Sequence, residues 1–200
     1  MSDDVTAVVL VGGRSARMGR DKAMLVPDAG DGLPLAQVVL DSLCGVAGHS
    51  LLGGRSLPGV DVPAVADQYD DAGPLGGVAS ALSAVRTPLA VVAACDMPSI
   101  VPALLQLLLD RARGDGDAAA VMCRSDAGLE PLLGVWRPAL ALPVLRAALA
   151  EGVRALHVAV ARLPGAVVLA AEEWRGADPR GDSFRNWNAP EDLPTTTTLL

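Results

Sequence analysis

A glycine-rich stretch near the start of the chain concentrates positive charge on residue types that bind anions. LVGGRSARMGRDK, residues 10–22, holds four of the sixteen Lys and Arg residues of a chain whose formal net charge is −7. Gly12 and Gly13 predict a tight turn with positive φ that brings backbone N–H groups to an anion. Arg17 would add a bidentate fork and Lys22 a point charge. The stretch therefore indicates a phosphate-binding loop, with an exposed turn of solvated arginines as the alternative.

Two carboxylates follow apolar runs further along the chain. Asp96 ends the run LAVVAACD, and Asp67 follows VPAVA. Mg²⁺ is a hard cation that takes one or two carboxylates together with substrate phosphates, so Asp96 is a candidate metal ligand. Asp96 could instead cap the helix that follows it. Asp67, with Asp70 and Asp71, could equally be part of a solvated acidic loop.

The elements that must position these residues alternate along the sequence between strand and helix. Apolar or β-branched runs predict strands at 5–11, 49–54, 62–67, 89–96, 118–123, 131–136 and 166–170. Helical spacing predicts helices at 33–46, 74–85, 101–112, 138–152 and 153–162. Pro143 is expected to kink or divide the fourth of these helices.

This alternation predicts an α/β fold, a mostly parallel, doubly wound, Rossmann-like sheet covered by helices on both faces. We expect a single domain over residues 1–193 and a disordered tail over 194–200. Ligands of such sheets bind outside the carboxyl ends of the strands. That rule places Gly12, Gly13 and Asp96 at one edge, where they could act together.

Composition excludes several classes of protein. The apolar runs are shorter than the roughly 18–20 residues of a membrane span, and the acidic N-terminus does not resemble a secretory signal, so we expect a cytoplasmic protein. A sequence pI of about 4.7 argues against nucleic-acid binding. The three cysteines form no CxxC pair, which argues against a disulfide framework or a zinc site.

The opening stretch resembles a family signature, L-x-G-G-x-S-x-R-M-G-x-D-K, of nucleotidyltransferases related to molybdopterin guanylyltransferase. Three later stretches agree in the family's order: VADQYDDAGPLGGVASAL at 65–82, CDMPSI at 95–100 and FRNWNAPEDL at 184–193. The resemblance covers residues 5–193. It implies the fold of nucleotide-diphospho-sugar transferases and a reaction that transfers GMP from GTP to molybdopterin with release of pyrophosphate.

The resemblance also assigns roles to residues of this chain. It implies that the nucleotide is bound by Leu10, Val11, Gly12, Gly13, Lys22, Asp67 and Asp96. Lys22, Arg17 and Asp96 would be catalytic, with Asp96 holding Mg²⁺. Asn186 and Asn188 would face the second substrate or the metal shell, and Trp187 could line the pterin site. The segment LLGGRSLPG lacks the family's nucleotide-contacting asparagine, a position that Arg55 or Gly53 could fill.

Two other functions stay open at this point. The first is a cytidylyltransferase or a sugar-phosphate nucleotidyltransferase of the same fold. The second is a catalytically silent nucleotide-binding partner in cofactor delivery, against which the presence of Lys22 and Asp96 argues. Cofactor-insertion proteins and molybdoenzymes are the protein partners that the resemblance implies, and no membrane or nucleic acid is expected to bind.

Overall fold

Seven strands form one sheet whose spatial order, β3-β2-β1-β4-β6-β5-β7, differs from their order in the chain. The computed structural model describes residues 2–12, 21–26 and 32–187. The strands are β1 (Val5–Leu10), β2 (His49–Gly54), β3 (Ala64–Ala66), β4 (Leu89–Ala94), β5 (Ala120–Ser125), β6 (Gly128–Trp136) and β7 (Val167–Leu169). All pairings are parallel except those of β6, which runs antiparallel to both β4 and β5.

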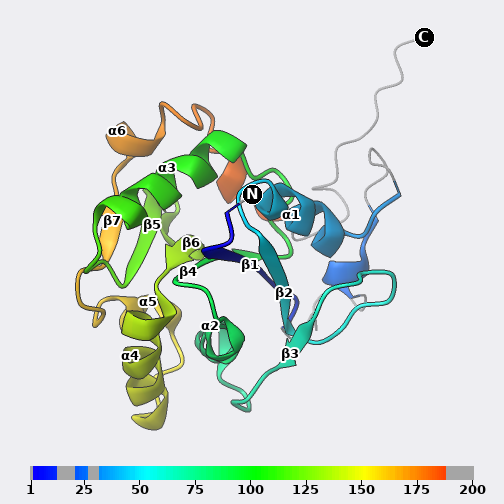
Figure 1. Ribbon diagram of the computed structural model, residues 1–200, viewed down its shortest axis with the longest axis horizontal. Helices are drawn as coiled ribbons and strands as arrows, with labels where there is room; N and C mark the ends of the chain where they lie inside the picture. Colours follow the sequence, from blue (N-terminus) through cyan, green and yellow to red (C-terminus); the bar gives the residue numbers. More distant parts are fainter. Residues whose placement is uncertain (1, 13–20, 27–31, 188–200) are drawn as a thin grey trace.

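Helices cover both faces of this sheet, so the expected three-layer, mostly parallel architecture is confirmed (Figure 1). On one face lie α1 (Leu35–Cys44), α3 (Pro102–Gly114) and α6 (Ala171–Trp174). On the other lie α2 (Gly73–Ala84), α4 (Pro138–Ala150) and α5 (Leu156–Val160). Two short 3-10 helices, η1 (Lys22–Met24) and η2 (Asp182–Phe184), complete the regular elements of the described residues.

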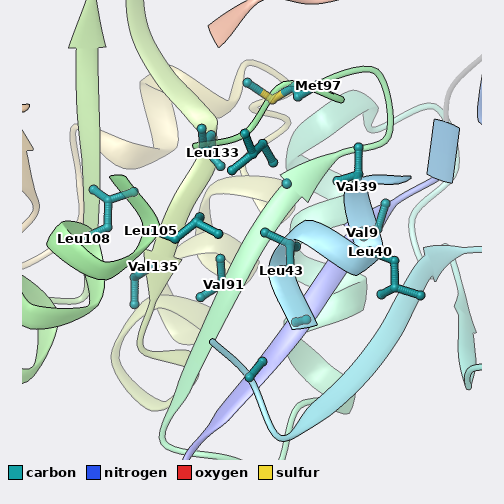
Figure 2. Packing of buried hydrophobic residues seen from close by; sticks show 14 of the residues in the cluster. Val9, Val39, Leu40, Leu43, Val91, Met97, Leu105, Leu108, Leu133 and Val135 are labelled. Atoms are coloured by element: carbon teal, nitrogen blue, oxygen red, sulfur yellow. The ribbon is translucent and has the colours of Figure 1, made fainter. Parts of the chain in front are cut away.

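Each face of the sheet has its own apolar core. Side chains alternate between the faces along a strand, so Val9 and Val91 pack with Leu43 and Leu105 on one side (Figure 2). Val8 and Val92 face the opposite way and belong to the second core. Every residue of β1 is buried, which explains why its sequence shows no polar alternation.

Four local features differ from the sequence-based expectations. α4 is one continuous helix, so Pro143 does not divide it, and Ala141 and Leu145 on either side of the proline are buried in the core. The last expected helix shortens to α5, and β6 begins at Gly128, earlier than expected. The short helix α6 was not expected at all, and the predicted tail, 194–200, lies outside the described residues.

Within the part of the chain that the structure describes, no helix has both the length and the apolar character needed to cross a membrane.

Candidate active site

The order of the strands reverses beside β1. The candidate site lies at the edge of the sheet formed by the carboxyl ends of β1 and β4, which we call the crevice. From β1 the chain adds β2 and β3 on one side, then crosses back to place β4 on the other. The first connection runs through α1 on one face, and the return runs through α2 on the opposite face (Figure 1). In open α/β sheets such a switch point is where ligands bind, at the carboxyl ends of the strands.

The backbones that leave β1 and β2 touch at this edge. The N–H of Val11 donates a hydrogen bond of 2.8 Å to the carbonyl of Gly53. Gly54 has a φ of +119°, and a Cβ on it would lie 2.8 Å from the nitrogen of Gly12. A side chain at position 54 is therefore excluded by both conformation and space.

Gly12 is glycine for a different reason from the one predicted. Its φ is not positive, so the expectation of a left-handed turn is wrong at this position. A Cβ on Gly12 would lie 3.0 Å from Oδ2 of Asp67 and 3.7 Å from Cα of Gly54. Glycine at this position leaves room for the exposed carboxylate of Asp67, and the backbone of Gly12 stays exposed at the crevice.

Asp67 follows β3 and is brought to the same place. Its Oδ2 faces Gly12, and its Oδ1 lies 3.8 Å from the position that a Cβ on Gly77 would take in the first turns of α2. The carboxylate is exposed and lies between the end of β1 and the start of α2. The structure therefore brings this predicted nucleotide-binding residue to the predicted loop.

Lys22 and Asp96 meet across the crevice. Nζ of Lys22 lies 3.3 Å from Oδ2 of Asp96, and the two side chains are 22% and 21% exposed. Lys22 opens η1, whereas Asp96 follows β4, so the pair joins residues 74 positions apart. An ammonium and a carboxylate, both reachable from solvent at the sheet edge, can contact the phosphates and the counter-ion of a nucleotide.

A second ion pair fixes the segment that carries Lys22. Asp21 caps η1, because its Oδ1 accepts a hydrogen bond of 3.2 Å from the N–H of Ala23. The other oxygen of Asp21 is ion-paired with Arg55, which directly follows β2. Arg55 is thus tied to Asp21, and the pair anchors the residue preceding Lys22 to the end of a core strand.

Negative charge is dense at the end of β4. Burial, together with the nearby carboxylates of Asp96 and Asp21, raises the pKa of the Cys95 thiol to about 12, whereas Lys22 opposes the shift. Because a thiolate is disfavoured by both effects, Cys95 is a poor nucleophile. The carboxylates of Asp96 and Asp21 and the ammonium of Lys22 thus all lie close enough to Cys95 to affect its pKa.

Asp96 does not cap α3, so that alternative is wrong. The N-cap of α3 is Val101, and no side chain of the helix's own start bonds there. Instead the N–H of Val101 donates a hydrogen bond of 2.9 Å to Oγ of Ser183, a residue 82 positions later. The carboxylate of Asp96 is therefore not engaged at the start of α3, and it pairs with Lys22 in the crevice.

The C-terminal segment returns to the same loop. The backbone N–H of Trp187 donates a hydrogen bond of 2.8 Å to the carbonyl oxygen of Asp96. Asn186 precedes it and is exposed, so this predicted second-substrate residue lies in the segment beside Asp96. Asn188 lies outside the described residues, as do Gly13 and Arg17.

Leu10 and Val11 are almost fully buried, with 8% and 5% of their surfaces exposed. Only their backbone could reach a nucleotide, and their side chains serve the cores.

Sequence reasoning missed three contributors to the site. The positive φ of Gly54 could have been suspected from the Gly53-Gly54 doublet that ends a strand. The bonds from Val101 to Ser183 and from Trp187 to Asp96 join residues remote in sequence and leave no local signal. Both connect the C-terminal segment to the loop after β4.

The donor set fits a cation that keeps most of its own water. The described residues contain no group of three His, Cys, Asp or Glu side chains that could enclose a metal ion. Asp96 offers a hard oxygen at the end of β4, beside Lys22. Mg²⁺ needs no protein cage, since it binds through one or two carboxylates and completes its shell with water and phosphate oxygens.

A doubly wound sheet with a glycine approach, a lysine and a carboxylate at its switch point defines a nucleotide-binding α/β protein. Comparison with known sequences narrows this class. Residues 7–164 match the family model described as "MobA-like NTP transferase domain", and the chain belongs to this family.

Similar proteins cover nearly the whole chain. A protein of Chloroflexus aggregans named "Probable molybdenum cofactor guanylyltransferase" is 39% identical over 98% of this chain and 95% of its own length. A "Molybdenum cofactor guanylyltransferase" of Rhodopseudomonas palustris strain BisB5 is 34% identical over 94% of this chain and 90% of its own.

A solved structure agrees with these sequences. The molybdopterin-guanine dinucleotide biosynthesis protein A of Archaeoglobus fulgidus is 28% identical, with a TM-score of 0.77 over 94% of each chain. A cytidylyltransferase of Thermus thermophilus, which is 14% identical with a TM-score of 0.65, shares the fold.

Proposed function

We propose that the protein transfers GMP from GTP to molybdopterin and releases pyrophosphate, which yields molybdopterin guanine dinucleotide. The observation that carries the proposal is the Lys22–Asp96 pair at the strand switch point. Membership of the MobA-like family and relatives of matching length that carry the guanylyltransferase name support it.

The proposed reaction joins two anions. A phosphate oxygen of the acceptor forms a bond to the α-phosphorus of GTP, and the bond from that phosphorus to the bridging oxygen of the β-phosphate breaks. Catalysis of such a transfer depends on positioning and charge neutralisation more than on covalent work by the protein. Concentrated positive charge on a chain of net charge −7 has a clear use in this reaction.

Each residue has a proposed part. The exposed backbone of Gly12 and the carboxylate of Asp67 bind the nucleotide, and Lys22 stabilises charge that builds on the α-phosphate. Arg17 and Gly13 would extend the phosphate-binding loop, and Asn186 and Asn188 would face the acceptor. Asp21 and Arg55 hold the segment that presents Lys22.

Mg²⁺ is the proposed cofactor, and Asp96 is the residue that would hold it. A bound divalent cation would supply Lewis-acid stabilisation of the phosphate oxygens. The Lys22 ammonium, 3.3 Å from Oδ2 of Asp96, would then neutralise phosphate charge beside the ion.

Pyrophosphate release tests the proposal. The purified protein, GTP, Mg²⁺ and molybdopterin should release pyrophosphate and form the guanine dinucleotide, and omission of molybdopterin or addition of EDTA should stop the reaction. Equal turnover with CTP would favour a cytidylyl transfer within the same fold. Binding of GTP without any transfer would favour a silent nucleotide-binding partner.

Thermal stabilisation separates the nucleotides directly. A ligand that binds the folded state raises the melting temperature in proportion to the logarithm of its concentration over Kd. We expect GTP with Mg²⁺ to raise it more than CTP or UTP at equal concentration.

The proposal extends to a cytoplasmic location and to cofactor-insertion proteins or molybdoenzymes as recipients of the product.

A further inference from the structure

A cleft outside the Lys22–Asp96 crevice is lined by three arginines and two aromatic residues. It has a volume of about 260 Å³ and lies between α6, η2 and the turn that joins β5 to β6. Its lining includes Arg175, Arg180, Arg185, Trp174 and Phe184, and the guanidinium of Arg175 lies over the Trp174 ring, 5.3 Å from its centroid. We call these five residues the arginine pocket.

The floor of the arginine pocket is fixed by buried contacts. Trp174 is 2% exposed, and its indole N–H donates a hydrogen bond of 3.0 Å to the carbonyl of Arg124 at the end of β5. Phe184 packs edge-on against Trp174 with ring centroids 5.0 Å apart. The two aromatic side chains are therefore fixed by their packing, whereas the arginine side chains above them are exposed to solvent.

The turn that carries two of the arginines is also preformed. Asp178 is 1% exposed, and its two oxygens accept hydrogen bonds of 3.0 and 2.9 Å from the N–H groups of Asp182 and Ser183. Gly181 takes a φ of +65° in the same turn. Because the buried carboxylate of Asp178 holds this turn, it fixes the backbone that carries Arg180 and Arg185.

Positive charge exceeds negative charge at the pocket. Arg175 is paired with Asp126 at 3.0 Å, while Arg180 and Arg185 share Asp182 at 2.7 and 3.4 Å. Three guanidinium groups thus face two carboxylates. Each guanidinium carries five N–H donors in a planar fork, more than these contacts engage, so the pocket offers donors and planar surfaces to a ligand.

The arginine pocket lies at the same edge of the sheet as Asp96. Met122 of β5 and Val92 of β4 both pair with Gly134 of β6, which places them at one level. Ser125 lies three residues beyond that level, and Asp96 lies four beyond it. Neighbouring strands are about 4.8 Å apart, and β6 lies between β4 and β5, so the ends of β4 and β5 are on the order of 10 Å apart at this edge.

The chain itself connects the two sites. After Arg185 it runs directly to Trp187, whose N–H bonds to the carbonyl of Asp96, while Ser183 holds the start of α3. The red segment at η2 lies against the beginning of α3 in Figure 1, where the loop after β4 ends. One rigid strip of backbone therefore borders both the arginine pocket and the crevice.

We infer that the arginine pocket receives the heterocyclic end of the acceptor substrate while its phosphate end reacts beside Lys22 and Asp96. This inference rests on the proposed function. Guanidinium groups stack on flat rings and donate to ring oxygen and nitrogen atoms, which suits a heterocycle such as a pterin, whose ring carries a carbonyl oxygen and acceptor nitrogens. Arg185 stands directly before Asn186, the residue that the resemblance assigns to the second substrate, so the pocket lies beside the expected acceptor site.

The test compares the variant Arg180→Gln/Arg185→Gln with the control Arg162→Gln. Glutamine keeps donors beside Asp182 but removes both charges, and Arg162 is an exposed arginine paired with Glu151 on the opposite face of the sheet. We expect the KM for molybdopterin to rise about tenfold or more, the effect of losing a charge-assisted hydrogen bond. The KM for GTP and the melting temperature should stay near the wild-type values, and the control should change neither KM.

A binding measurement makes the test independent of turnover. Pterin-6-carboxylate, a stable anionic pterin, should bind the wild-type protein and the control, measured by its fluorescence, and should bind the double variant at least about tenfold more weakly. Equal KM and equal binding in the double variant would overturn the inference and leave guanylyl transfer intact. If the wild-type protein does not transfer GMP, the proposed function is wrong. The pterin-binding measurement then still tests the arginine pocket, and equal affinity of the wild type and the double variant would overturn it.

Discussion

At the scale of single residues, the crevice depends on few atoms placed with little tolerance. Lys22 and Asp96 each have about one fifth of the side chain exposed, so each is held by protein while open to a ligand. The carboxylate of Asp67 lies close to Gly12, where a Cβ would come within 3.0 Å of its Oδ2. The sequence was enough to assign roles to these residue types, but it could not show how closely other residues pack around them.

Removal of either member of the central pair should abolish most turnover. We expect Lys22→Ala and Asp96→Ala each to lower kcat at least about a hundredfold, the scale for loss of a key electrostatic group. Asp110→Ala, an exposed carboxylate on α3 that bonds only to Gln106 in the same helix, is the matched control. Near-normal pyrophosphate release by the Asp96→Ala protein would remove the role given to that carboxylate.

The ion pair before Lys22 predicts an effect that follows charge and geometry. Arg55→Ala should lower kcat by roughly tenfold, because Asp21 then caps η1 without its anchor, whereas Arg55→Lys should recover part of the rate. If Arg55 instead contacts the nucleotide, the KM for GTP should rise in Arg55→Ala while kcat is kept. Steady-state kinetics of both variants separate the two outcomes.

At the scale of elements, some features were predictable and others were not. The runs of buried β-branched residues at β1 and β4 predict central parallel strands because both faces are covered. The antiparallel direction of β6 relative to β5 could also have been predicted, because the expected strands 118–123 and 131–136 are too close in sequence for the crossover of about a dozen residues that a parallel pair needs. The pairing of Ser183 with Val101 arises only when the chain has folded.

Gly54 and Gly128 have similar φ angles but different surroundings, so alanine variants at the two positions distinguish the effect of backbone strain on stability from that of steric crowding. Gly54 and Gly128 have φ values of +119° and +125°, but a Cβ on Gly54 would lie 2.8 Å from the nitrogen of Gly12, whereas nothing lies within 4 Å of one on Gly128. Both alanine variants should lose about 1–3 kcal/mol of unfolding free energy through strain. Gly54→Ala should lose more, because the end of β1 must also move, and urea denaturation measures the difference.

The start of α3 is stabilised from a distance. Ser183→Ala should cost about 1–2 kcal/mol of unfolding free energy, because the buried hydroxyl that accepts the N–H of Val101 is lost. Ser42→Ala removes a hydroxyl that bonds only within α1, to the carbonyl of Val38, and should change stability little. Equal loss in both variants by urea denaturation would contradict the long-range cap.

At the scale of the whole molecule, the sheet divides the interior into two cores and isolates two of the three thiols. Cys95 and Cys123 are buried, whereas Cys44 at the end of α1 is only partly so. In the native protein a colorimetric thiol reagent should therefore titrate one cysteine quickly and two slowly, and all three in urea. Cys44→Ser should remove the fast phase, and a fast phase that persists would contradict this arrangement of the core.

The buried thiols also set how stability depends on alkaline pH. Burial raises the pKa of Cys123 to about 12 from an ordinary value of 9.0. The unfolded chain therefore releases this proton between those values while the folded chain retains it, so the unfolding free energy falls as pH rises from 9 to 12. Denaturant titrations over this interval should show the decline, and a flat profile would contradict it.

The match to the MobA-like family model ends at residue 164, yet α6, η2 and the turn held by Asp178 all follow that point. Relatives named guanylyltransferases nevertheless cover 94–98% of this chain, so the strip formed by α6, η2 and this turn is part of the same folded body. Trp174 of this strip packs in the apolar core, and its indole N–H bonds to the carbonyl of Arg124. Exchanging residues 170–187 for those of a relative that lacks the three arginines should then raise the KM for molybdopterin while leaving the KM for GTP unchanged.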